Sequence, residues 1–211
     1  MSPRITLFDP VTMSETQREV YESIINGPRG RLVGPLRAVL LVPELAMLWS
    51  RFGEHLRYST TIPQRSKELA ILVTARRWNS HVEWEIHSGD ALAAGVPRSI
   101  IDAIRIGELP ALDNEADAEV YEFARQLLET GDVDNDVHSA AVVRWGEAGV
   151  VELTAVIGYY SMVSLMLNAQ AIPTIKGVPT LQPLVPGVAL SALPSAMLFR
   201  KDRAKAKVEK G

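Results

Sequence analysis

The sequence contains no cysteine. This absence excludes disulfide bonds, thiolate metal sites, iron–sulfur clusters and cysteine nucleophiles or redox pairs. Charge of one sign is also scarce, because 22 basic and 25 acidic side chains leave a net charge of only −3. Without a basic stripe, nucleic-acid binding has little electrostatic support, and we expect no nucleic-acid partner.

Long apolar runs and strand patterns are missing as well. The chain has no run of about 18 uninterrupted apolar residues, so we expect no membrane partner. Its first residues lack the apolar core of a signal peptide, and a cytoplasmic location is the default expectation. Alternating apolar residues bounded by turn residues do not occur, which predicts an all-α fold.

Helical periodicity and proline content divide the chain into three parts. We expect an extended N-terminal segment at 1–13, a single all-α domain at 14–173 and a proline-rich, partly disordered tail at 174–211. Glu-Leu pairs that precede two strongly apolar stretches suggest a degenerate two-fold helical repeat. The predicted helices cover 14–26, 43–59, 63–78, 80–95, 97–108, 114–129, 134–145 and 150–171.

Ionisable groups are concentrated in the stretch from Gln64 to Pro97. Glu83 and His87 are four residues apart, so they lie on one face of a helix, and Glu68 stands near the start of the preceding helix. A carboxylate beside an imidazole raises its proton affinity, whereas burial lowers it. Two carboxylates in one pocket tend to differ in pKa, which provides one acid and one base. We therefore take His87, Glu83 and Glu68 as candidate catalytic residues.

Two other interpretations remain open for this stretch. Ser80 and Glu83 have the spacing of a helix capping box, which would explain both residues without catalysis. The second interpretation is a metal site with ligands from His81, Glu83, His87 and His55. However, His81 and His87 point to different helix faces, and the spacing is not that of a HExxH motif.

Four side chains are candidates for substrate binding. Ser80 could donate a hydrogen bond, and Trp84 could wall an apolar pocket. Arg57 and Arg65 could each clamp a carboxylate, because guanidinium binds carboxylates in a fork. Helix capping, core packing and solvation are the plain alternatives for these side chains.

The central stretch resembles the carboxymuconolactone decarboxylase family, which includes the alkylhydroperoxidase D-like proteins. The resemblance lies in Arg65-x-x-Glu68-Leu-Ala followed by Ser80-x-x-Glu83-Trp-x-x-His87 and Gly95, and extends more loosely from 34 to 173. It implies an all-α homo-oligomer, usually a trimer or hexamer. Glu68 and His87 match peroxidase positions, but the two cysteine positions of that branch are Ser80 and Glu83. Thiol-dependent peroxidase activity is therefore disfavoured.

The decarboxylase branch carries a glutamate and a histidine four residues apart, as Glu83 and His87 are, and uses neither metal nor organic cofactor. The resemblance thus implies a cofactor-independent acid/base enzyme. The expected reaction is decarboxylation of a small organic acid or lactone of the aromatic-catabolism type. The alternatives are a lactone hydrolase or isomerase on a similar substrate, and a non-catalytic small-molecule-binding oligomer. An exposed, unpaired Glu83 would favour the last.

Overall fold

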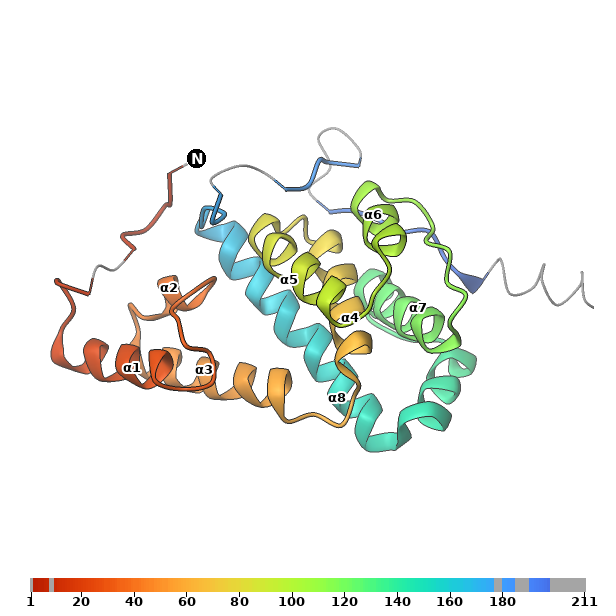
Figure 1. The fold of residues 1–211 in the computed structure, drawn as a ribbon, viewed down its shortest axis with the longest axis horizontal. Coiled ribbons are helices and arrows are strands. Elements are labelled where there is room, and N and C mark those ends of the chain that lie inside the picture. The colour runs from red at the N-terminus through yellow and green to blue at the C-terminus, as the bar shows by residue number, and fades with distance from the viewer. Residues whose placement is uncertain (1, 8–9, 177–179, 185–189, 198–211) are drawn as a thin grey trace, which may run out of the picture.

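The computed structural model describes residues 2–7, 10–176, 180–184 and 190–197. Over these ranges the chain forms eight α-helices and no strand, which confirms the all-α prediction (Figure 1). The helices are α1 (Glu15–Ile25), α2 (Leu36–Val39), α3 (Pro43–Tyr58), α4 (Gln64–Arg77), α5 (His81–Ala93), α6 (Arg98–Ile106), α7 (Glu115–Thr130) and α8 (Asn135–Ala169).

Helix α4 is the centre of the domain. Every side chain from Ser66 to Arg76 is buried, and the helix contacts α5, α6, α7 and α8. A helix that is apolar on nearly all sides is stable only when neighbours cover it all round. The sequence prediction of a central buried helix is therefore confirmed.

Two hydrophobic clusters flank α4 and α5. One is built mainly from α4, α6, α7 and the first half of α8, and includes Leu72 and Trp84. The other joins α1, α2 and α3 to the second half of α8, and includes Ile71 and Val82. Because α4 and α5 contribute to both clusters, they form the wall between them. In Figure 1, α1 to α3 accordingly lie to one side of α4 and α5, and α6 and α7 to the other.

Most helix boundaries agree with the sequence. Ser14 and Gln17 form the predicted capping box at the start of α1. Pro63 is the N-cap of α4, whereas the sequence predicted it as the first helical residue, one position later. The short helix α2 was not predicted, because four residues show no periodicity. Both helices predicted at 134–145 and 150–171 are present, and they follow each other within α8 across a kink at Gly146, whose φ of 71° is not helical.

The apolar face predicted for α3 is only partly in the core. Leu56 is buried, but Leu45, Leu48 and Phe52 are 41%, 66% and 46% exposed. The buried side of α3 instead carries small and aromatic residues, namely Ala46, Trp49, Ser50 and Gly53. Helical spacing identified an apolar stripe correctly but could not tell which side of α3 the core would cover.

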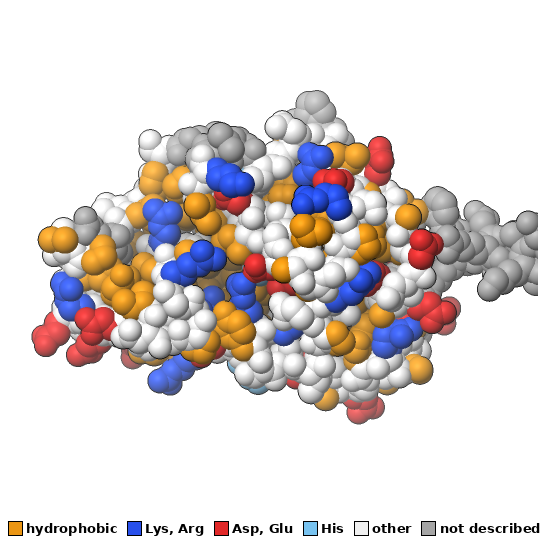
Figure 2. Space-filling view, viewed as in Figure 1, with side chains coloured by type: hydrophobic (Ala, Val, Ile, Leu, Met, Phe, Trp, Pro, Cys, Tyr) orange, Lys and Arg blue, Asp and Glu red, His pale blue; other side chains and the backbone are white. Residues whose placement is uncertain are grey.

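Helix α8 alone among the described helices has the length and apolarity of a membrane span. Half of its most apolar window is buried inside the protein, and Leu153, Ile157 and Leu167 belong to the core. Core packing therefore accounts for its composition. On the face that Figure 2 shows, basic and acidic side chains are interspersed rather than gathered by sign.

The described C-terminal segment (174–176, 180–184 and 190–197) is held against the helices by hydrogen bonds. Arg76 donates to the Gln182 carbonyl at 2.7 Å, and His81 Nδ1 accepts the backbone N–H groups of Thr180 and Leu181 at 3.2 and 3.1 Å. Leu181 and Leu193 are buried. This part of the proline-rich tail is thus extended but firmly docked, whereas the predicted disorder at the very end falls on residues outside the described ranges.

Candidate active site

Helices α4 and α5 bring the three predicted catalytic side chains together. Asn79, with φ 49°, makes the tight turn between the helices, so that α5 packs back along α4. Glu83 and His87 occupy one face of α5, and Glu68 comes from the facing side of α4. Their exposed fractions are 3%, 2% and 0%, so solvent does not reach the cluster.

The imidazole of His87 lies between the two carboxylates. Its Nδ1 is 2.7 Å from Glu68 Oε2, a hydrogen-bond distance, and its Nε2 is 3.4 Å from Glu83 Oε2. Gln64 donates from Nε2 to the other Glu68 oxygen at 2.6 Å, and the Gln64 side chain lies on the exposed side of α4. Glu68 thus fixes the orientation of the ring, while Nε2 keeps the looser contact and is the nitrogen free to exchange a proton.

This arrangement favours the protonated imidazole. Burial lowers the pKa of His87, but the charges and hydrogen bonds of Glu68 and Glu83 outweigh it and raise the pKa to about 9. His87 therefore carries a proton at neutral pH. With two carboxylates beside one imidazolium, the cluster holds one transferable proton and two groups that can accept it.

Tyrosines of α8 complete the wall around His87. The Tyr160 ring meets the imidazole edge to face, with centroids 4.9 Å apart, and Tyr159 packs in turn against Tyr160. Burial, with the charge of Glu83 next in size, raises the pKa of Tyr160 well above its usual value. Tyr160 thus stays neutral and lines the site. Sequence reasoning missed both tyrosines, because nothing in the apolar pattern of α8 distinguishes them from core residues.

Ser80 does not form the predicted capping box. It occupies the N-cap position of α5, but its side chain makes no capping hydrogen bond, and its buried Oγ has no hydrogen-bond partner among the residues that the structure describes. Glu83 faces His87 instead of reaching back to the helix start. The plainest alternative explanation for Ser80 and Glu83 is therefore wrong.

The other proposed substrate-binding side chains occupy different surroundings. Trp84 is 3% exposed and packs in the cluster with Leu72. Arg65 has its donors in use, since Nε and Nη2 bind Asp117 at 3.0 and 2.6 Å and Nη1 binds the Gly95 carbonyl. Arg57 hydrogen-bonds Asp90 through Nη2 at the partly exposed side of the site.

The metal ligands considered from the sequence do not converge. His81 binds the C-terminal segment, and His55 is exposed. A different trio could offer ligands, because one atom each of Glu68, His87 and Asp90 lies within 4.8 Å of the others. However, Arg57 already supplies a positive charge to Asp90, and metal binding needs an unprotonated imidazole nitrogen. The trio is better suited to holding protons than a cation.

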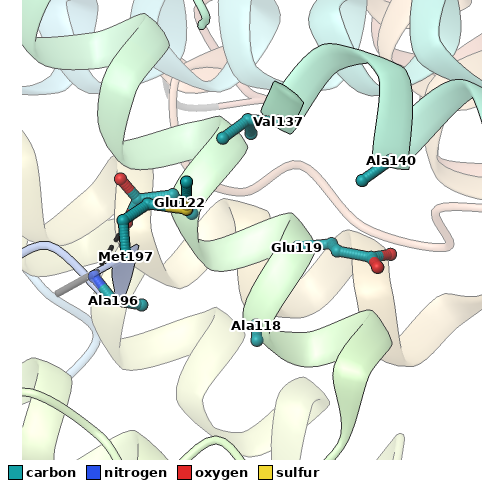
Figure 3. Close-up of a pocket in the computed structure, with 7 residues that line it drawn as sticks. All are labelled: Ala118, Glu119, Glu122, Val137, Ala140, Ala196 and Met197. Carbon is teal, nitrogen blue, oxygen red and sulfur yellow. Dashed lines mark hydrogen bonds between the residues drawn. The ribbon is translucent and has the colours of Figure 1, made fainter. Parts of the chain in front are cut away.

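A small pocket lies away from this cluster, between α7, the start of α8 and the C-terminal segment (Figure 3). Its free volume is about 10 Å³, room for about one water molecule. Glu122 at its edge accepts the Ala196 backbone N–H at 2.9 Å, which closes the segment over α7. The pocket is a packing gap and offers no space for a substrate.

Two solved structures share this architecture. An uncharacterized peroxidase-related protein from Silicibacter sp. TM1040 has a TM-score of 0.64 at 12% identity, over 83% of this chain and 93% of that one. The debrominase Bmp8, solved as a cysteine-to-alanine variant in complex with 2,3,4-tribromopyrrole, has a TM-score of 0.63 at 16% identity, over 81% of this chain and 91% of that one. No protein-family model and no curated protein matches the sequence. The chain therefore has the all-α fold of the alkylhydroperoxidase D-like proteins, a fold that it shares with enzymes.

Proposed function

We propose that the protein is a cofactor-independent acid/base enzyme that decarboxylates a small organic acid or lactone. The observation that carries this proposal is the buried imidazole held at 2.7 Å by Glu68, with its pKa raised to about 9. A general acid must be protonated at the working pH and held where it can deliver its proton. His87 meets the first condition, and its hydrogen bond from Nδ1 to Glu68 meets the second because it orients the ring.

In the proposed reaction, the bond between the substrate carbon and its carboxylate breaks, and its electron pair stays on the carbon as an enolate. Nε2 of His87 then delivers a proton to that carbon, and CO2 leaves. Glu68 stabilises the imidazolium through Nδ1 and keeps Nε2 aimed. The negative charge of the substrate carboxylate passes to the enolate when CO2 leaves, and the neighbouring imidazolium stabilises it until the carbon is protonated.

An isomerase is the second candidate from the same cluster. Glu83 is buried beside His87 and could remove a proton that His87 returns to another carbon, moving a double bond without loss of CO2. A lactone hydrolase would use the same pair to activate water. A purely ligand-binding protein is less well supported, because Glu83 is buried and faces His87 rather than being exposed and unpaired.

The test compares wild type with His87→Gln, Glu83→Gln and Glu68→Gln on a panel of lactones and enone acids. CO2 release, ring opening and deuterium incorporation from heavy water are followed together. We expect each variant to lose roughly 10²- to 10⁴-fold in kcat, the usual contribution of a general acid or base. Asp102→Asn, in an exposed ion pair with Arg105, is the control and keeps full activity. Turnover that survives in both His87→Gln and Glu83→Gln would remove the proposed site.

Self-association is also part of the proposal. The exposed apolar stripe of α3, formed by Leu45, Leu48 and Phe52, together with Leu41 just before the helix, leaves apolar surface facing solvent. Burying such a stripe against a second copy would remove it from water. Leu48→Glu should shift the mass measured by light scattering toward the monomer, whereas Leu190→Glu, at a 37% exposed position outside the stripe, should not.

A further inference from the structure

One partly exposed ion pair lies beside the buried catalytic cluster. Arg57 at the end of α3 binds Asp90 of α5, and the two side chains are 23% and 39% exposed. Asp90 follows His87 by three residues, so both lie on the same face of α5. A small molecule approaching the buried imidazole from this side would meet this pair first.

The carboxylate of Asp90 lies where the acid group of a substrate would be useful. One of its oxygens is within 4.8 Å of a nitrogen of His87 and an oxygen of Glu68. A substrate carboxylate in the same place would bring the carbon that loses CO2 close to the His87 imidazole. The carboxylate of Asp90 thus occupies the position that the proposed reaction requires for the carboxylate of the substrate.

Arg57 is built to hold an anion at this position. Lys67 is buried on α4, and its Nζ donates to the Arg57 and Leu56 carbonyls at 2.7 and 3.4 Å, which fixes the end of α3. Burial lowers the pKa of Arg57, but the charges of Asp90 and other neighbours raise it on balance, so the guanidinium stays charged.

The donors of Arg57 are also less committed than those of Arg65. Arg65 makes three hydrogen bonds within the protein, through Nε, Nη1 and Nη2. Within the described part of the chain, Arg57 makes one hydrogen bond, from Nη2 to Asp90. A guanidinium offers five N–H donors in a planar fork that matches a carboxylate. Arg57 therefore retains the capacity to receive a carboxylate in place of Asp90.

We infer that Arg57 is the receptor for the substrate carboxylate, and that Asp90 is a built-in carboxylate that occupies this receptor until substrate displaces it. Asp90 acts as a positioning residue: it keeps the guanidinium aimed and the site closed, at the expense of substrate affinity. The ligand class is a small organic acid with a single free carboxylate. This inference rests on the proposed function for the identity of the ligand.

The experiment measures binding rather than turnover. Benzoate and its neutral analogue benzamide are titrated into wild type, Asp90→Asn, Arg57→Gln and Asp102→Asn, and backbone amide shifts on α3 and α5 are followed by NMR. We expect Asp90→Asn to bind benzoate about tenfold more tightly than wild type, because an internal competing charge is gone. Arg57→Gln should lose benzoate binding, and Asp102→Asn should equal wild type. Benzamide should show no gain in Asp90→Asn.

Benzoate affinity in Asp90→Asn that equals or falls below the wild-type value would overturn the inference, as would undiminished binding in Arg57→Gln. If Arg57→Gln does not fold, Arg57→Lys is used instead, because it keeps the charge without the planar fork. Its benzoate affinity should be measurable but lower than that of wild type. Failure of the proposed function would give a different result. Asp90→Asn would still bind benzoate more tightly than wild type, but the wild-type protein would turn over no substrate of the panel. If turnover is found, KM in Asp90→Asn should fall, and kcat should fall with it as the guanidinium loses its alignment.

Discussion

At the scale of single residues, the defining feature is a charged imidazole sealed between two carboxylates. Removing a charge from water is costly unless partners compensate it, and Glu68 and Glu83 do so for His87. The compensation depends on the proton, because a neutral imidazole would leave two buried carboxylates facing each other across the ring. The protonation of His87 is therefore tied to the stability of the fold.

The first prediction concerns this link between pH and stability. The pKa of His87 is about 9 in the folded protein and 6.5 for an ordinary histidine. A raised pKa stabilises the folded state fully below pH 6.5, and this contribution is lost as pH rises through about 9. The free energy of unfolding, measured with urea, should fall by about 3 kcal/mol between neutral pH and pH values above 9. The same curve for His87→Gln should lack this fall, whereas His138→Gln, at an exposed position, should retain it.

The second prediction separates two serines that both precede helices. Ser14 caps α1 with its side chain, so Ser14→Ala should cost about 1 kcal/mol in the free energy of unfolding. Ser80 is buried, and its Oγ has no partner in the described part of the chain, so Ser80→Ala removes an unsatisfied hydroxyl. That change should leave stability unaltered or raise it by up to about 1 kcal/mol. A loss at Ser80 as large as that at Ser14 would show that Ser80 has a hidden partner.

At the scale of helices, the crossing of α3 and α8 depends on one glycine. A Cβ at Gly53 would stand 2.0 Å from the Tyr159 hydroxyl oxygen and 2.4 Å from an Arg29 nitrogen. The Tyr159 ring packs near Trp49 and Tyr160, and Tyr160 contacts His87, so the ring has little room to withdraw. The close contact of α3 with α8 therefore helps to place the wall of the site.

The third prediction follows from this crossing. Gly53→Ala should lower the free energy of unfolding by about 1–3 kcal/mol, the usual cost of overpacking, and should reduce activity by shifting Tyr160. Gly89→Ala is the matched control within α5, because a Cβ there meets nothing within 4 Å. That change should raise stability by about 0.5–1 kcal/mol, since alanine is the better helix former. Thermal unfolding of the two variants beside wild type provides the measurement.

At the scale of the whole molecule, the sequence predicted the helical architecture and the pairing of Glu83 with His87 well, because both follow from helical periodicity. The place of Glu68 beside them, on another helix, was expected from the family resemblance rather than from spacing. The remainder depends on contacts between distant segments. Tyr160 is about seventy residues from His87 in sequence, and nothing in α8 marks it as different from a core residue. Contacts between distant segments also decide which side of α3 faces solvent and where the C-terminal segment docks. The spacing of residues within one helix does not reveal these contacts.

The fourth prediction tests the C-terminal segment as part of the domain. Leu181 is 1% exposed and belongs to the core cluster of α4 and α7. Leu181→Ala should therefore cost about 2–5 kcal/mol and lower the midpoint of a single cooperative transition. Leu190→Ala, at a 37% exposed position of the same segment, should change stability by no more than about 0.5 kcal/mol. Equal, small effects at both positions would show that the segment is detachable.

The seal over Glu68 has a further consequence for the order of events in a catalytic cycle. Gln64 bonds one Glu68 oxygen at 2.6 Å, and a carboxamide does not ionise in water, so it does not relay protons. On the other side, Asp90 is the partly exposed carboxylate beside His87 and Glu68. In the proposed reaction, an incoming acid would take the place of Asp90 at Arg57, and a proton returning to His87 would arrive by way of the same partly exposed carboxylate. Substrate binding and reprotonation would then exclude each other in time, and the product would have to leave before His87 could be recharged.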